Sequence, residues 1–269
     1  MTAILKSKYP APRYATAVVM VASTILLAAP RAQAQNGDDA QKILKAMSDY
    51  LESQKSISAT FNSDIEVITP DLEKIQFDDT GQFLLNRPDK LRATRTGGYA
   101  DVELVFDGKT ATLYGKNHKA YAQVDAPGTT DQLIDKLRHE YGVEAPGSDL
   151  LMARSYPELM SDVYDAKHIG RGVVDGVECE HLAFRGQDTD WQIWIEVGPR
   201  PIPHKYVITS KTVAGGPQYT LRISDFKTDA HADPDAFAFK IPADAKKVDA
   251  RELSDIDQVP PGVVVGGIK

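Results

Sequence analysis

The sequence predicts a mainly β fold of the α+β class: one antiparallel sheet of about eleven strands, with a helix before it and a helical insert in its middle. Short apolar runs separated by turn residues follow one another over 61–239. Apart from the insert, they leave no room for a crossover helix, so neighbouring strands are expected to be antiparallel. Asp107-Gly108 and Asp175-Gly176 are typical of tight hairpins. Helical periodicity replaces alternation at 38–51 and within 129–163.

The first 34 residues have the pattern of a secretory signal peptide. A basic start is followed by the apolar stretch 15–29 and by Ala32-Gln33-Ala34, so cleavage is expected after Ala34. The apolar stretch has about 15 residues, fewer than the roughly 20 of a spanning helix, which disfavours the alternative of an uncleaved anchor. We therefore expect a periplasmic protein with one folded domain, 35–245, and a flexible C-terminal tail, 246–269.

The mature chain is strongly acidic. The signal contains four of the 31 basic residues and none of the 38 acidic residues, so 27 basic residues remain and the net charge is about −11. Such a protein has no general attraction to nucleic acid or to anionic lipid surfaces, and any contact with a membrane must be apolar. The single cysteine, Cys179, excludes an internal disulfide, so the apolar core must hold the fold together.

The mature chain begins with an amphipathic helix, expected at 38–51 and capped by Asp38 or Asp39. Its apolar residues fall on one stripe: Ala40, Ile43, Leu44, Met47, Tyr50 and Leu51. The following stretch, 61–69, alternates between apolar and polar residues, as a half-buried strand does.

A turn at 78–81 is expected to separate the strand at 73–77 from a buried strand that contains Phe83, Leu84 and Leu85. Pro88 ends that strand, because proline has no N–H for the sheet and holds the preceding residue in an extended conformation. The guanidinium of Arg87 is therefore expected at the end of the strand.

Further strands are expected at 93–96, 102–106, 111–114, 120–124, 168–174, 177–184, 191–197, 205–211, 219–226 and 237–239. Eight aromatic residues fall on them: Tyr114, Tyr121, Trp191, Trp194, Tyr206, Tyr219, Phe237 and Phe239. One interpretation is that they fill a sandwich core. The other is that one sheet face is curved and left partly open for an apolar ligand. Alternation fits both interpretations.

The insert has clear helix signals. Thr129 and Gln132 have the spacing of a capping box, and Gly142 is expected to end the helix. Two shorter helices are expected at 148–153 and 157–163. They carry apolar residues that we expect to be exposed: Leu150, Leu151, Met152, Leu159 and Met160. Short helices rich in Leu and Met between two sheet halves favour a movable cover.

Motifs for catalysis are scarce. The six histidines are scattered without metal-binding spacing, and neither a phosphate-binding loop nor Gly-x-Ser-x-Gly occurs. Cys179 and His181 lie on the same face of a strand. They could belong to a metal site, a thiolate site or the active site of a hydrolase, or they could simply pack in the fold. Packing is favoured because no third candidate is nearby. We therefore predict a protein that is not an enzyme, with no cofactor and no metal.

Three blocks resemble the LolA-like superfamily of periplasmic lipoprotein carriers, which includes LppX-like proteins. They are the Gly81–Arg92 stretch with its Arg-Pro step, the Leu104–Tyr114 hairpin with Asp-Gly-Lys-Thr, and the closing stretch Tyr219–Ala243. The stretch 190–196, followed by Pro-x-Pro-x-Lys at 201–205, is most similar to a domain-of-unknown-function branch of predicted periplasmic proteins. The resemblance implies an unclosed β-barrel of about eleven antiparallel strands with a helical lid. Its concave apolar face would take acyl chains.

The resemblance also implies roles for single residues. Arg87 would be a latch that bonds to the lid backbone and holds the empty form shut; the alternative is an ordinary ion pair with Asp89. Leu91 would be a contact at the cavity entrance. The chain has Leu91-Arg92-Ala93 where the carriers usually place an aromatic pair, so the resemblance does not identify the cargo.

The sequence thus predicts a periplasmic lipid- or lipoprotein-binding carrier that holds acyl chains in an apolar cavity. The alternative is an envelope protein-interaction or sensor module with the same fold and a filled interior. Expected partners are acyl chains and a membrane-protein donor or acceptor in the envelope, with no nucleic acid, and the protein is expected to be a monomer. The predicted ligand-binding residues lie on strands: Phe83, Leu85, Leu91, Leu113, Tyr121, Ile193, Ile195, Tyr206, Ile208, Tyr219, Leu221 and Ile223.

Overall fold

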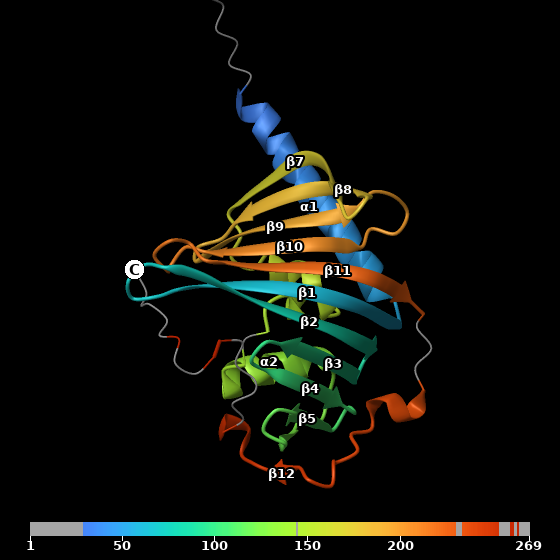
Figure 1. Cartoon of the computed structure of the whole chain (residues 1–269). Helices are drawn as coiled ribbons and strands as arrows, with labels where there is room; N and C mark the ends of the chain where they lie inside the picture. The colour runs from blue at the N-terminus through green and yellow to red at the C-terminus, as the bar shows by residue number, and fades with distance from the viewer. Residues whose placement is uncertain (1–28, 144, 230–232, 253–258, 261–262, 264–269) are drawn as a thin grey trace, which may run out of the picture.

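A computed structural model describes residues 29–143, 145–229, 233–252, 259–260 and 263 (Figure 1). The predicted signal lies outside these residues up to position 28, and so does most of the predicted tail beyond 252. Within the described residues, twelve strands form one open sheet in the order β12-β6-β5-β4-β3-β2-β1-β11-β10-β9-β8-β7. Eleven strands pair antiparallel, and the short β12 pairs parallel with β6. The predicted mainly β fold class, with its antiparallel open sheet, is confirmed.

The first half of the chain contains α1 (Ala29–Ser53), β1 (Ser56–Ile68), β2 (Lys74–Asn86), β3 (Lys90–Gly97), β4 (Asp101–Phe106), β5 (Thr110–Gly115) and β6 (Ala120–Asp125). The insert follows as α2 (Thr130–Tyr141), the 3₁₀ helix η1 (Ser148–Leu151) and α3 (Ser155–Leu159). The second half contains β7 (Asp165–Val174), β8 (Val177–Arg185), β9 (Thr189–Glu196), β10 (Pro203–Ser210), β11 (Gln218–Thr228), η2 (Pro234–Phe237), β12 (Lys246–Lys247) and η3 (Ala250–Glu252). Among the described helices, none is both long and apolar enough to cross a membrane.

The sheet has one face that is covered by helices, which we call the concave face. Alternate residues of each strand point to it, as the register pairs Phe61 with Ile223 and Tyr206 with Ile193 show. The apolar stripe of α1 and the insert share one core with these residues. In Figure 1, α1 crosses the strands of the second half, and α2 lies beside those of the first half.

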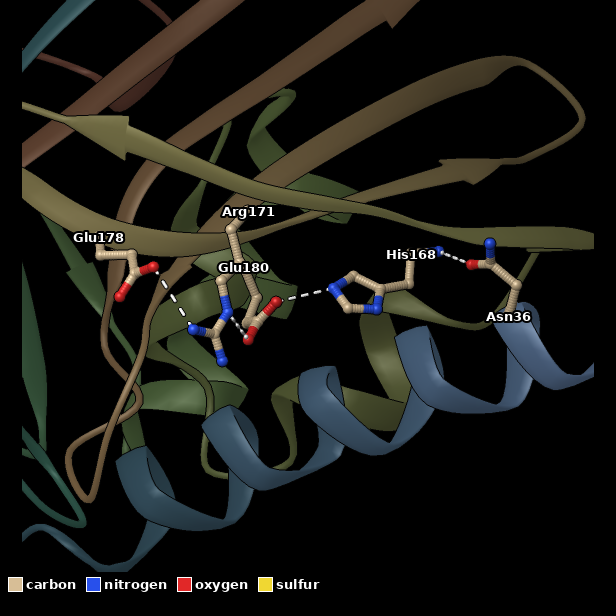
Figure 2. Close-up of polar contacts among 5 residues, drawn as sticks. All are labelled: Asn36, His168, Arg171, Glu178 and Glu180. Atoms are coloured by element: carbon tan, nitrogen blue, oxygen red, sulfur yellow. Dashed lines mark hydrogen bonds and ion pairs between the residues drawn. The ribbon is translucent and has the colours of Figure 1, made fainter.

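The start of α1 is fastened to the edge strand β7. The backbone N–H of His168 donates to Asn36 Oδ1 at 2.5 Å. Figure 2 shows Glu180 of β8 between the side chains of His168 and Arg171, at 2.7 and 3.0 Å. The bond to Asn36 lies before the predicted helix start at 38, because α1 begins at Ala29.

Two predictions about β2 and the insert are wrong. The turn expected at 78–81 does not form, because β2 pairs with β1 without interruption over its whole length. Gly81 is needed in that strand because the ring of Phe61 on β1 lies where a side chain would project. Leu150, Met152 and Leu159 are buried rather than exposed, and Leu151 and Met160 are half-buried, because the insert packs into the concave face.

The caps of α2 are confirmed. Thr129 and Gln132 form both hydrogen bonds of a capping box, and Gly142 adopts the left-handed conformation with φ 66°. These bonds satisfy backbone groups at the helix ends.

The C-terminal segment lies on the other, outer face. Phe237 belongs to η2 and Phe239 to a loop, not to a strand as predicted. Arg92 Nη1 donates to the carbonyl of Ala236 at 2.9 Å, and the ring of Phe239 packs against Tyr114 at 5.7 Å. In the expected tail, residues 246–252 include β12 and η3, which lie along the edge of β6.

Candidate ligand cavity beneath the insert

Eleven of the twelve predicted ligand-binding residues share the concave face. The strand registers align them, and all eleven belong to the shared core: Phe83, Leu85, Leu91, Leu113, Ile193, Ile195, Tyr206, Ile208, Tyr219, Leu221 and Ile223. Period-two alternation was therefore sufficient to choose the correct face for them.

Tyr121 lies on the outer face instead. It pairs with Tyr114 and packs against Phe239 at 6.1 Å, while its neighbour Ala122 is fully buried on the concave side. A shift of one residue along a strand moves a side chain to the opposite face, so Tyr121 does not reach the cavity.

A cavity of about 160 Å³ remains between the concave face and the insert. Only Ser148 and Tyr219 contribute polar side chains to it. The other lining residues are Leu51, Ile57, Phe61, Phe83, Ala93, Ala145, Pro146, Gly147, Leu150, Leu151, Pro203, Leu221, Ile223 and Phe226. The cavity is therefore almost wholly apolar.

Four predicted residues line this cavity: Phe83, Tyr219, Leu221 and Ile223. Tyr206 and Ile208 line a second cavity, described below. Leu85, Leu91, Leu113, Ile193 and Ile195 are buried in the surrounding core and do not line either space.

Sequence reasoning missed several lining residues. Ile57 lies before the predicted start of the first strand, and Leu51 was assigned only to the stripe of the first helix. Ala93 is too small to attract attention as a pocket residue, although it pairs directly with Phe83 across the two strands. Ala93 lies two residues after Leu91 on one strand, and this spacing is the signal that places both on the concave face.

The cover of the cavity is the segment 145–151, which approaches the sheet closely. Gly147 has φ 86°, and a Cβ atom there would lie 2.9 Å from Leu221 Cδ2. Glycine is therefore required at this position by both its backbone conformation and its contact with β11.

The rest of the insert is held by polar contacts. The backbone N–H of Thr130 donates to the carbonyl of Pro88 at 2.8 Å. The carboxylate of Asp131 accepts the N–H of Ala153 at 3.0 Å. Together they tie the first turn of α2 to the end of β2 and to the segment after η1.

Arg87 lies beside this contact but does not make the predicted hydrogen bond. Its Nε and Nη2 atoms are buried and have no hydrogen-bond partner among the described residues. Burial lowers the pKa of the guanidinium, while the charges of Asp131 and Glu52 oppose that shift. Asp89, the alternative partner, is paired with Lys90 at 3.6 Å. The Arg-Pro step thus contacts the insert through the Pro88 carbonyl and through the attraction between Arg87 and Asp131.

A buried carboxylate lies on the concave face near the cavity. Asp79 is 6% exposed, and burial raises its pKa although the charge of Arg95 opposes the shift. Burial also raises the pKa of the Tyr219 hydroxyl. For both groups burial disfavours the charged form, as expected beside an apolar cavity.

Cys179 and His181 lie on the outer face. Cys179 is fully buried, and burial raises the pKa of its thiol to about 11. The ring of His181 stacks on Trp194 at 4.0 Å, and its Nε2 atom is 2.9 Å from Gln192 Oε1. In the part of the chain that the structure describes, no group of three or more His, Cys, Asp or Glu residues is arranged to hold a metal ion.

Comparison with known proteins identifies a family over most of the chain. Residues 40–250 match DUF2092, described as a predicted periplasmic protein. A comparison with curated proteins finds no match.

Several solved structures are distantly similar. An uncharacterized conserved protein from Thermus thermophilus has 14% identity and a TM-score of 0.49, covering 78% of this chain and 99% of that chain. LprF from Mycobacterium bovis has 15% identity and a TM-score of 0.44, with coverages of 78% and 98%. The LolA superfamily protein NE2245 from Nitrosomonas europaea has 14% identity and a TM-score of 0.37, with coverages of 75% and 97%.

Proposed function

Since the chain belongs to the DUF2092 family of predicted periplasmic proteins, we propose that it is a carrier that holds the acyl chain of a lipid or lipoprotein in the cavity beneath the insert. Family membership confirms the periplasmic location that the sequence predicts, and the resemblance to a branch of predicted periplasmic proteins. The cargo and its site are the proposal.

The observation that carries the proposal is the apolar lining of the cavity. Its volume of about 160 Å³ is close to that of an engineered cavity of about 150 Å³, lined by Leu, Ile and Phe, that stays dry and binds benzene. Water would find few hydrogen-bond partners there, because only Ser148 and Tyr219 have polar side chains. A hydrocarbon group is the ligand that fits this chemistry.

A long acyl chain needs more volume than the cavity of about 160 Å³ provides. The insert is the part that would move to make room. Leu150 and Leu151 line the cavity from the cover, so they occupy space that a ligand would take. Exposing two leucines costs about 3–6 kcal/mol, whereas burying about 16 methylenes contributes about 13 kcal/mol. Exchange of the insert for a ligand is therefore favourable, and the covered form is the empty state of the carrier.

A cavity-filling variant tests the proposal. Ala93→Phe places a ring in the cavity, whereas Thr94→Phe places the same ring on the outer face of the same strand. We expect a fluorescent fatty acid to bind the wild type and Thr94→Phe alike, and Ala93→Phe about tenfold or more weakly. Thermal unfolding would confirm that both variants fold.

Two outcomes would reject the carrier. One is wild-type protein, purified repeatedly from its own periplasm, that shows no bound amphiphile in native mass spectrometry and takes up no fatty acid. The other is equal uptake by Ala93→Phe and Thr94→Phe.

A second function, a protein-interaction module, is favoured by the edge strand β7. Within the described sheet β7 pairs only with β8, and Ile169 and Val173 are 55% and 71% exposed on it. Asn36 of α1 bonds to the N–H of His168 on this edge, and beyond that residue an edge strand with apolar side chains is a template for an added strand. Crosslinking to an envelope protein that is lost in Ile169→Lys but kept in Leu72→Lys, with no lipid bound to the wild type, would favour this function over the carrier.

A further inference from the structure

A second cavity, of about 380 Å³, lies on the other side of the cover. Ala145, Pro146 and Tyr219 line both cavities, so the two are neighbours. The second cavity differs in chemistry because three acidic and three aromatic side chains line it.

Its charged residues leave an excess of negative charge. Asp149, Glu158 and Asp162 contribute three carboxylates, and Arg138 contributes one guanidinium. Arg138 donates to Asp149 at 2.6 Å and to Glu158 at 3.2 Å. The three carboxylates and the one guanidinium give the wall a net charge of −2.

Tyr206 adds a hydrogen-bonding group without a partner. Its side chain lines the cavity and is 3% exposed, and its hydroxyl forms no hydrogen bond with any described residue. Burial, with the charges of Asp149 and Asp162, raises the pKa of this hydroxyl. Tyr206 therefore offers a neutral oxygen acceptor beside two carboxylates.

Aromatic rings complete the wall. Trp191 and Tyr206 both line the cavity and meet edge to face, with ring centroids 5.7 Å apart. Aromatic faces and carboxylates are the groups that attract organic cations in proteins. Oxygen acceptors further suit a primary ammonium group, which has three N–H donors.

We propose that the second cavity binds the primary ammonium head of an amphiphile whose hydrocarbon tail occupies the apolar cavity. This inference rests on the proposed function for the tail and names the chemical class of the head. The shared wall at Pro146 and Tyr219 is where the head and the tail of such a ligand would join.

Three probes of equal chain length separate the two sites: dodecylammonium, dodecanol and dodecanoate, each below its micelle concentration. We expect the wild type to bind dodecylammonium about tenfold more tightly than dodecanol, and dodecanoate most weakly. Because the whole mature chain is acidic, part of this preference could come from its net charge, which a charge-matched control must remove.

Asp162→Asn and Asp135→Asn provide that control. Both remove one negative charge from an exposed position, but Asp162 lines the cavity, whereas Asp135 on α2 does not. Asp162→Asn is expected to lower the preference for dodecylammonium about threefold or more, and Asp135→Asn to leave it unchanged.

The outcomes distinguish the two proposals. Equal binding of the ammonium and the alcohol, or equal effects of the two variants, would overturn the ammonium site while the acyl cavity stands. Binding of none of the three probes would overturn the acyl cavity as well.

Discussion

The hydroxyls of Ser48 on α1 and Ser155 on α3 share a hydrogen bond of 2.8 Å, and both side chains are buried. Ser48 Oγ also accepts the backbone N–H of Tyr156 at 2.9 Å. A polar contact inside an apolar core fixes one arrangement, because any other would leave these groups without partners. It therefore positions α3, at the end of the insert, relative to α1.

Ser48→Ala is expected to loosen the insert. The change leaves the Ser155 hydroxyl and the Tyr156 N–H without a partner, which costs about 1–3 kcal/mol. Urea unfolding should show this loss, and hydrogen exchange at Tyr156 should be faster. Ser53→Ala on the same helix is the control, since Ser53 is exposed and its hydroxyl bonds only to the near neighbours Tyr50 and Gln54. Equal unfolding free energies for the two variants would show that the hydrogen bonds of Ser48 do not hold the insert in place.

Gly81→Ala is expected to destabilise the sheet and disturb the cavity. A methyl group there would meet the ring of Phe61, which lines the cavity, and the carbonyl of Thr94. Overpacking of this kind costs about 1–3 kcal/mol. In Gly98→Ala the added methyl has no neighbour within 4 Å, so this variant should unfold at nearly the wild-type urea concentration. If Gly81→Ala and Gly98→Ala unfold at the same urea concentration, the predicted clash of the added methyl group with Phe61 does not destabilise the sheet.

Asp64→Asn is expected to change how stability depends on pH. Burial, together with a hydrogen bond and repulsion from Asp78, raises the pKa of Asp64 above its ordinary value of 3.8. The folded state then binds more protons than the unfolded state just above pH 3.8, so the stability contributed by this group falls as pH rises through that window.

The variant lacks that titration and should be more stable than the wild type at pH 7, by about 0.5–1 kcal/mol. The gain should vanish below pH 3.8. Urea unfolding at several pH values measures both. A gain that is the same at every pH would refute the explanation.

Cys179 is expected to be unreactive in the native protein. Because burial raises the pKa of its thiol to about 11, about one thiol in a thousand is ionised at pH 8. Ellman's reagent should give no signal with native protein and one equivalent in urea. The signal is unambiguous because the chain has one cysteine. Rapid reaction of native protein would show that the outer face near Cys179 opens.

Local patterns predicted much of the fold. Alternation chose the correct face for Ile193 and Leu221, since a strand's side chains change sides at every residue. Thr129 and Gly142 marked the ends of α2 because caps involve only neighbouring backbone groups. Tyr121 was placed on the wrong face because a short strand between turns does not fix its own register.

By itself, the sequence determined the strand-rich class, the antiparallel direction of consecutive strands and the place of the insert. It also identified most of the residues on the concave face. Only the tertiary structure decided that β2 runs on through Gly81, that Leu150 is buried, and that space remains beneath it. The reason is physical. Strand and helix patterns arise from contacts between near neighbours, whereas an empty volume depends on how closely α1, the insert and the sheet approach one another.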